Sequence, residues 1–477
     1  MPTCTTSERR PEQTPLYRLL QDHLASFLLA AERRDDRALP RFVRKALTAH
    51  LRCGVLSLGF ARYRCPSCKH EHLSAHSCKA RGLCPSCDGR RMTQLAAHLT
   101  DHVFPHVPTR QWVLTFPHAL RYRLAYDHAL LNAVHVVVAR ALSADYARRA
   151  RRDPRLSAGR KPQTGFVTFI QRFGSALNLN LHFHIHAIDG VFVRSNDGAP
   201  TFLPTKPPSP EEMQALAETI RTRVLRLLYR RGVLEGESSP DPLHEDSPQL
   251  AACYAASIRN TSALKSPGRR LLRIRRAERR AKPFTPSGAH GHADGFDLHA
   301  NLTVRAGNRA RLERILRYIA RPALANERLK RLADGSYTLK LKTPWHDGTS
   351  HLRLHPHEVI ERLAALIPKP HKNLLHYSGV LAPNHKWRKH IVAFRAMRTT
   401  PRAPDRNPSW AELMRRSFAK DPLACPHCGT EMRFIANLLE HKAITRFLRH
   451  LGLHTEPPQV QPARAPPQLD LDFDDVA

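Results

Sequence analysis

The sequence predicts an α+β fold built around a largely antiparallel sheet. Two neighbouring runs, GFVTFIQRF at 165–173 and LNLNLHFHIHAID at 177–189, have the composition and length of strands and are joined by a tight connection. Stretches with helical periodicity, such as 125–150 and 210–232, lie between such strands along the chain. This mixture of helices with strands that neighbour one another as in hairpins is typical of the α+β class.

The remaining elements follow from the same patterns. The first 40 residues contain apolar positions at helical spacing and predict a helical lead-in. The segment 308–322 predicts a helix that ends near Pro322, because the residue before a proline disfavours helical geometry. Strands are predicted at 111–117, 296–304, 335–345, 351–354 and 373–382, and a further helix at 355–368.

Composition shifts divide the chain into four expected parts. Residues 1–40 are the helical lead-in, 41–110 a cysteine-rich zinc-binding domain, 111–385 the main α+β domain and 386–477 a basic C-terminal region with an acidic, disordered tail. Within the main domain, residues 234–295 are expected to be an irregular basic insertion.

The charge balance indicates a polyanionic partner. The chain has 76 Lys and Arg against 41 Asp and Glu, a formal net charge of +35. Nucleic acid is the leading candidate, ahead of an anionic membrane surface, although a generally basic proteome could account for part of the surplus. The sequence has neither a stretch of 18 apolar residues nor an apolar segment of signal-peptide type at its start, so we expect a cytoplasmic protein without a membrane partner.

Ten cysteines without a signal peptide indicate metal binding rather than disulfides. Cys65 and Cys68 form one CxxC pair, and Cys84 and Cys87 form a second pair 15 residues later, which predicts one structural Zn²⁺ site with four thiolates. Two further thiols could replace a ligand, serve a second site or simply be buried. These are Cys53 and Cys78.

Another CxxC pair lies near the end of the chain, at Cys425 and Cys428. It supplies only half of a zinc site. Its partners could be His427, His441 or another chain, or the pair could be a bare structural turn.

The run at 177–189 places three histidines on one face of its strand. Side chains alternate between faces, so His182, His184 and His186 share one face and leucine, phenylalanine and isoleucine share the other. Same-face neighbours lie about 7 Å apart along a strand, and imidazoles at this spacing can converge on one ion. A divalent metal site is therefore favoured over neutral surface histidines.

Four stretches resemble the rolling-circle transposases of the insertion-sequence-91 family. They are SCKARGLCPSCDGRR, RFGSALNLNLHFHIHAIDGVF, FDLHANLTVRAGNRARLERILRYIARPALA and VIERLAALIP with LLHYSGVLAPNHKWR, and together they span most of residues 40–435 in the family's order. The resemblance implies a small antiparallel-sheet nuclease core of the histidine-hydrophobe-histidine (HUH) type, preceded by the zinc module. It also implies a single-strand DNA endonuclease and strand transferase that uses Mg²⁺ or Mn²⁺.

The resemblance also implies roles for individual residues. The metal-binding pair is His182 and His184, with His299 or His186 as a third ligand; Gln171 is a further candidate. The nucleophile is Tyr318, which forms a 5′-phosphotyrosine. Some relatives have a second tyrosine one helical turn earlier, where this chain has an arginine. A tyrosine hydroxyl has a pKa of about 10, so it needs assistance at neutral pH, and a metal on the phosphate would provide it.

Basic residues near the tyrosine and in the insertion are candidates for DNA contact. Beside Tyr318 these are Arg317 and Arg321, and the insertion contributes Arg269, Arg270, Arg273 and Arg276, although a solvated linker explains the latter group almost as well. The expected partners are single-stranded DNA at the ends of a mobile element and target DNA, in a bacterial cytoplasm at the nucleoid.

Three alternatives remain at the level of sequence. A plasmid replication initiator or relaxase would use the same chemistry. A transposase remnant would bind DNA without cleaving it. A metal hydrolase would use the histidine strand without the tyrosine.

Overall fold

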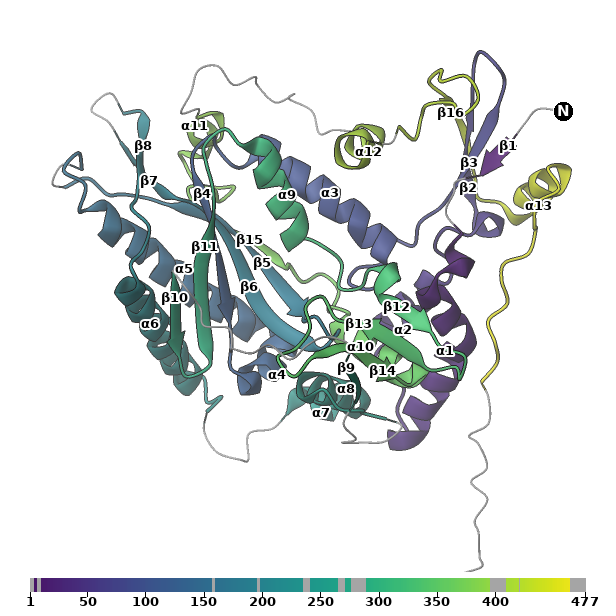
Figure 1. Ribbon diagram of the computed structural model, residues 1–477, viewed down its shortest axis with the longest axis horizontal. Coiled ribbons are helices and arrows are strands. Elements are labelled where there is room, and N and C mark those ends of the chain that lie inside the picture. Colours follow the sequence, from purple (N-terminus) through teal and green to yellow (C-terminus); the bar gives the residue numbers. More distant parts are fainter. Residues whose placement is uncertain are drawn as a thin grey trace, which may run out of the picture.

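The computed structural model describes residues 4–6, 10–156, 159–194, 198–234, 241–264, 271–275, 289–394, 409–419 and 421–463. Its largest sheet has six strands in the order β10-β11-β4-β6-β5-β15, and every neighbouring pair is antiparallel (Figure 1). The strands are β4 (Thr109–Thr115), β5 (Gly165–Phe173), β6 (Leu179–Ile188), β10 (His290–Ala293), β11 (Phe296–Val304) and β15 (Leu375–Gly379). The predicted α+β class with an antiparallel sheet is confirmed.

Helices cover both faces of this sheet, so β6 is buried along nearly its whole length. The apolar face of β6, with Phe183 and Ile185, shares a core cluster with α5 (His128–Ala150). The histidine face pairs in register with Val167 and Phe169 of β5, which pack with α3 (Pro85–His102) and α9 (Arg309–Ile319). Figure 1 shows α9 and α3 side by side in front of the sheet.

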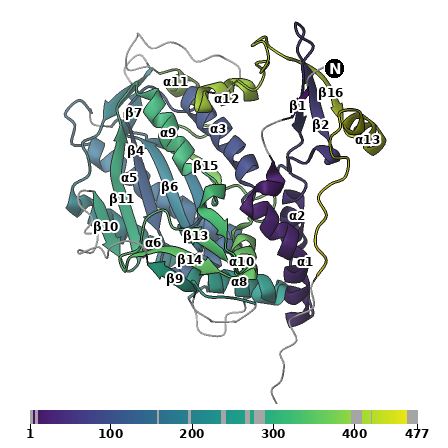
Figure 2. The same ribbon diagram turned by 45° about the vertical axis from the view of Figure 1, so that its right-hand side comes forward.

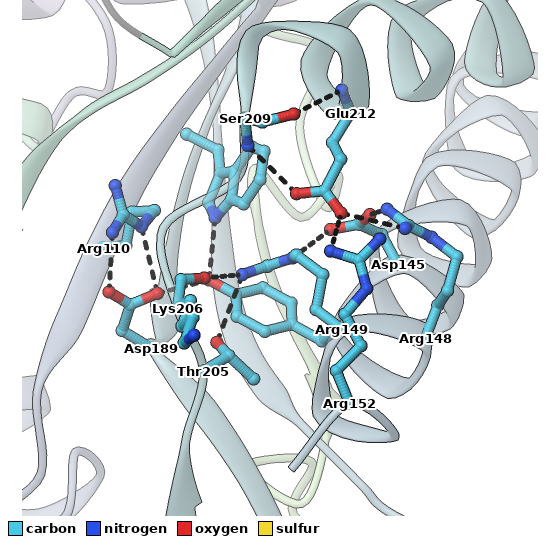
Figure 3. A network of polar contacts seen from close by, with 12 residues as sticks. Arg110, Asp145, Arg148, Arg149, Arg152, Asp189, Thr205, Lys206, Ser209 and Glu212 are labelled. Carbon is cyan, nitrogen blue, oxygen red and sulfur yellow. Dashed lines mark hydrogen bonds and ion pairs between the residues drawn. The ribbon is translucent and has the colours of Figure 1, made fainter.

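A buried polar network fixes the sheet to α5 (Figure 3). Arg110 of β4 donates two hydrogen bonds to Asp189, at 3.0 and 2.9 Å, and a third to the carbonyl of Ala300 on β11 at 2.7 Å. Tyr146 of α5 donates its hydroxyl to Asp189 at 3.4 Å and accepts the indole N–H of Trp112 at 3.0 Å. These bonds join β4, β11 and α5 to the bend that directly follows the histidine strand.

The segment expected to be an irregular insertion contains regular structure, which corrects that prediction. Two helices, α7 (Pro242–Asp246) and α8 (Pro248–Arg259), fold there, and α8 buries Leu250, Cys253 and Tyr254. These apolar positions recur every three or four residues between a proline start and a left-handed Asn260, so local periodicity explains the helix. It packs against α10 (Pro356–Leu366) and α1 (Pro15–Asp35) of the helical lead-in.

A four-stranded antiparallel sheet lies beside these helices, in the order β12-β13-β14-β9. Its strands are β9 (Leu272–Arg275), β12 (Leu329–Arg331), β13 (Tyr337–Lys340) and β14 (Thr349–Leu354). The other connecting elements are the hairpin β7 (Gly190–Arg194) and β8 (Pro200–Pro204), the helices α2 (Arg41–His50), α4 (His118–Tyr126), α6 (Pro210–Arg230) and α11 (Arg388–Ala393), and 3-10 helices at Pro11–Gln13, Leu56–Leu58 and Asn326–Arg328.

A separate small sheet joins segments from opposite ends of the chain. Its order is β1-β3-β2-β16, with β1 (Cys4–Thr6), β2 (Phe60–Arg64), β3 (Glu71–Ala75) and β16 (Arg433–Leu438). Figure 2 shows it apart from the large sheet, with α13 (His441–His450) packed beside it. The chain reaches β16 after α12 (Trp410–Phe418), which contacts α3.

Candidate active site and metal centres

His182 and His184 meet on the helix-covered face of β6. Each is 8% exposed, and their Nε2 atoms are 3.1 Å apart. Burial lowers the pKa of His182 to about 4 and the pKa of His184 well below its ordinary value. Both rings are therefore neutral at pH 7, which is the form that binds a metal ion.

The hydrogen bonds of the two rings suit metal binding at Nε2. Nδ1 of His182 donates to the carbonyl of Asn180 at 2.7 Å, which leaves a lone pair on its Nε2. The amide of Gln111 lies 2.9 Å from Nδ1 of His184, and its other polar atom has no hydrogen-bond partner among the described residues. With its oxygen turned toward the ring, Gln111 accepts the Nδ1 proton and frees Nε2 of His184 in the same way.

The separation of the two Nε2 atoms fits one shared ion. Metal–nitrogen bonds of about 2.1 Å at right angles place adjacent ligand atoms about 3.0 Å apart, close to the 3.1 Å observed. With both Nδ1 atoms protonated, the two Nε2 lone pairs face each other and a cation between them removes their repulsion; with Nε2 of His184 protonated instead, the same contact is a hydrogen bond to His182. The donor set of two imidazoles therefore fits a divalent cation.

Tyr318 lines the same cavity as the histidine pair. It lies in the last turn of α9, whose apolar face packs on the sheet and leaves the tyrosine 43% exposed. The cavity has a volume of about 420 Å³ and includes His182, His184 and Tyr318 in its lining. The structure therefore brings together the three residues that the sequence singled out for catalysis.

Two cations flank the tyrosine ring. The guanidinium of Arg321 lies 4.2 Å from the ring centroid and Nζ of Lys342 lies 4.1 Å from it. Burial lowers the pKa of both groups, and Arg328 adds a further guanidinium to the cavity lining. This concentration of positive charge suits a phosphate. Sequence reasoning missed Lys342 and Arg328, which lie in other segments from the tyrosine helix and in no motif.

Neither preferred third ligand lies beside the histidine pair. His186 is fully buried and bonds to Oγ1 of Thr109 at 2.9 Å, and burial lowers its pKa to about 3. The ring of His299 lies 4.4 Å from that of His290, tilted by 31°, and His299 is two strands from His184 in the sheet, a distance of about 10 Å.

Gln171 is better placed than either histidine. It is the direct cross-strand partner of His182 and so projects from the same face. Its amide donates to the carbonyl of Ile319, next to the tyrosine, and its Oε1 has no hydrogen-bond partner among the described residues.

The arginines expected to contact DNA have different surroundings. Arg321 lines the cavity, whereas Arg317 donates to the carbonyl of Ser417 at 3.2 Å. Arg273 pairs with Asp347 at 3.2 Å and lies over the ring of Trp345. Three of the expected residues lie outside the described part of the chain: Arg269, Arg270 and Arg276.

The cysteines form two clusters, and their grouping differs from the expected one. The first consists of Cys53, Cys78, Cys84 and Cys87, and the second of Cys65, Cys68, Cys425 and Cys428. In each, the four sulfurs lie within 4.8 Å of one another and could hold a metal ion.

The two CxxC pairs of the N-terminal region lie in different local structures. Cys84 lies at the start of α3, where the N–H of Asp88 bonds to its carbonyl in helical fashion. Cys65 instead follows β2 and begins a hairpin turn. Cys78, considered as a spare thiol, joins the α3 pair together with Cys53.

Comparison with protein families agrees with these sites. A family model described as a transposase zinc-binding domain matches residues 19–116, and one described as a putative transposase matches residues 165–389. The chain belongs to the insertion-sequence-91 family of transposases. The resemblance predicted from the sequence is confirmed. Searches among curated proteins and among solved structures give no match.

A transposase binds and processes DNA, so DNA is the polyanionic partner that the net charge of +35 indicates. The zinc-binding domain of the transposase and its cysteine clusters support structural Zn²⁺. Within the described ranges, the transposase has no helix long and apolar enough to cross a bilayer.

Proposed function

We propose that this transposase nicks and rejoins single-stranded DNA through a 5′-phosphotyrosine on Tyr318, in rolling-circle transposition. The observation that carries the proposal is the cavity that Tyr318 shares with His182 and His184. Tyr318 is 43% exposed and so is not simply a core aromatic, and its position beside two buried, neutral imidazoles and several cations is typical of a functional site. It suits a nucleophile that must reach a phosphate.

The reaction exchanges one phosphoester bond for another. The Tyr318 oxygen forms a bond to phosphorus as the bond from phosphorus to the 3′ oxygen breaks; the phenol proton leaves to solvent and the 3′ oxygen takes up a proton. His182 and His184, with Gln171 as the proposed third donor, would hold a divalent cation. When bound, Mg²⁺ or Mn²⁺ supplies polarisation of the scissile phosphate. The 3′-OH of another strand can reverse the exchange without ATP.

Charged side chains indicate a path for the DNA strand. Arg321 lines both the catalytic cavity and an adjacent cavity of about 290 Å³. Arg81 and Arg91 of the zinc-binding domain line that second cavity with Gln171. A single strand that crosses both cavities would place successive phosphates against these guanidinium groups. The zinc-binding domain would thus help to hold the strand that the tyrosine cuts.

A covalent-adduct assay tests the proposal. Single-stranded DNA flanking the gene is labelled at its 3′ end, so that the label stays on the 5′-phosphate fragment, and is mixed with the protein and Mg²⁺ or Mn²⁺. We expect a labelled protein band on a denaturing gel with wild type and none with Tyr318→Phe or His184→Ala. Tyr229→Phe is the matched control, since Tyr229 lies 65% exposed on α6, and it should retain the band.

The outcomes separate the alternatives. An adduct lost in Tyr318→Phe but retained in Tyr229→Phe supports the tyrosine mechanism. Cleavage that survives in Tyr318→Phe would point to a metal hydrolase. DNA binding without any adduct from wild type would point to a non-catalytic protein. A replication initiator or relaxase would give the same adduct, and the family matches favour a transposase over both.

A further inference from the structure

We propose that Cys65, Cys68, Cys425 and Cys428 form a second zinc centre that fastens the C-terminal segment to the zinc-binding domain. We call these four residues the two-ended cluster. Cys425 and Cys428 lie beyond both family matches, which end at residues 116 and 389. The inference is independent of the chemistry proposed for Tyr318.

The sulfur positions fit a tetrahedral ion. Sγ of Cys65 lies 3.5 Å from Sγ of Cys428, and Sγ of Cys68 lies 3.6 Å from Sγ of Cys425 and 3.5 Å from Sγ of Cys428. Zinc–sulfur bonds of about 2.3 Å in a tetrahedron place the sulfurs about 3.8 Å apart. A disulfide would need about 2.05 Å. The first cluster has the same spacing, with sulfur pairs at 3.5 and 3.6 Å.

The two halves of the cluster share one turn geometry. The N–H of Cys65 bonds to the carbonyl of His70 at 2.8 Å, and the N–H of Lys69 bonds back to Cys65 at 3.1 Å. The second half repeats this pattern. The N–H of Cys425 bonds to the carbonyl of Thr430 at 2.9 Å, and the N–H of Gly429 bonds back to the carbonyl of Cys425 at 2.8 Å. Lys69 and Gly429 both have a left-handed φ, of 61° and 75°. This matching geometry shows two equivalent knuckles that each present a pair of thiols.

Strand pairing brings the two knuckles together. The first knuckle follows β2 directly and the second precedes β16, and these strands pair antiparallel with Arg64 opposite Arg433. The rings of His70 and His427 stack across the junction, 7° from parallel. Cys65 and Cys425 are buried with Met432 against them. The site is therefore built by the fold rather than by a chance approach of surface thiols.

The fastened segment also reaches the tyrosine helix. Arg416 of α12, nine residues before Cys425, donates to Asp101 of α3 at 3.0 Å and to Glu313 of α9 at 2.7 Å. The carbonyl of Ser417 accepts from Arg317, the neighbour of Tyr318. An ion in the two-ended cluster would fix the chain that follows α12 to the small sheet, while these contacts hold α12 itself against α3 and α9.

Zinc stoichiometry of the full-length protein tests the proposal. We expect two zinc ions per chain in a His182→Ala/His184→Ala background, which keeps zinc out of the proposed divalent site, measured by inductively coupled plasma mass spectrometry after gel filtration. In the same background, the double variant Cys425→Ser/Cys428→Ser should retain one. Cys253→Ala is the matched control because Cys253 is a lone buried thiol of α8, and it should retain two.

A second measurement guards against misfolding of the double variant. Co²⁺ replaces zinc in the wild-type chain, and its thiolate charge-transfer absorption should saturate at two equivalents. The proposal would be overturned if the wild type held one zinc ion and its cobalt absorption saturated at one equivalent. It would also be overturned if a folded double variant held two zinc ions. Tyr318→Phe should keep two ions, so a failure of the proposed function would not affect this result.

Discussion

Replacement of Asp189 by asparagine should destabilise the transposase strongly, because it leaves a guanidinium buried without its counter-ion. The side chains of Asp189 and Arg110 are 10% and 5% exposed and share two hydrogen bonds. Removal of one partner from a buried ion pair costs about 3–5 kcal/mol. At 1.36 kcal/mol per factor of ten, this lowers the folding equilibrium constant on the order of 100- to 5,000-fold.

Urea unfolding followed by far-UV circular dichroism measures this loss. Asp334→Asn is the control, because Asp334 pairs with Arg353 while 44% of each side chain is exposed to solvent, which screens the pair. The double variant Arg110→Met/Asp189→Leu should recover part of the lost stability, since it removes the unpaired charge. Equal midpoints for Asp189→Asn and Asp334→Asn would refute the reasoning.

Three further predictions concern the site and its surroundings. Gln111→Ala should raise the Mn²⁺ concentration for half-maximal adduct formation by about 10- to 100-fold, since it removes the group that orients His184; an unchanged requirement would contradict this role. Lys342→Met should slow adduct formation and reduce the salt slope of single-strand binding by about 0.7, as expected for one lost phosphate contact; an unchanged slope would exclude that contact. Burial lowers the pKa of His135 to about 4 in the folded protein. Between pH 6.5 and 4 the unfolded chain therefore binds more protons at His135 than the folded protein does, so the free energy of unfolding should fall as the pH drops through this range. His135→Gln should flatten that part of the profile of Tm against pH, and an identical profile would refute the assignment.

Local patterns in the sequence predicted the elements that carry the site. The strand at 165–173 coincides with β5, and the predicted strand at 296–304 with β11. The alternation in the sequence of β6 predicted that the histidines share a face. The structure places them on one face, because the alternation of side chains along a strand depends only on neighbouring residues. The position of Tyr318 beside them came from the family resemblance, since no local rule relates a helix at 309–319 to a strand at 179–188.

Features that depend on distant segments could not be predicted in this way. The nearest CxxC pairs were grouped by spacing, whereas the partner of Cys65 lies 363 residues away. Gln171 was ranked behind His299 because His299 lies in a family-like stretch shortly before the tyrosine helix. The sequence does not show that β4 separates the strand of His299 from β6. The helix α8 escaped notice because its alanine-rich run lies between long irregular stretches.

The two-ended cluster also sets an order in time. A ribosome adds about 5–20 residues per second, so Cys68 is made roughly 20 to 70 s before Cys428, which follows 360 positions later. During synthesis Cys65 and Cys68 therefore lack their two partner cysteines until the six-stranded sheet and its helices have been made. A copy shortened by a premature stop before Cys425 could carry the histidine pair and the tyrosine and still never close this junction. Closure of the cluster would therefore distinguish finished copies of the transposase from interrupted ones.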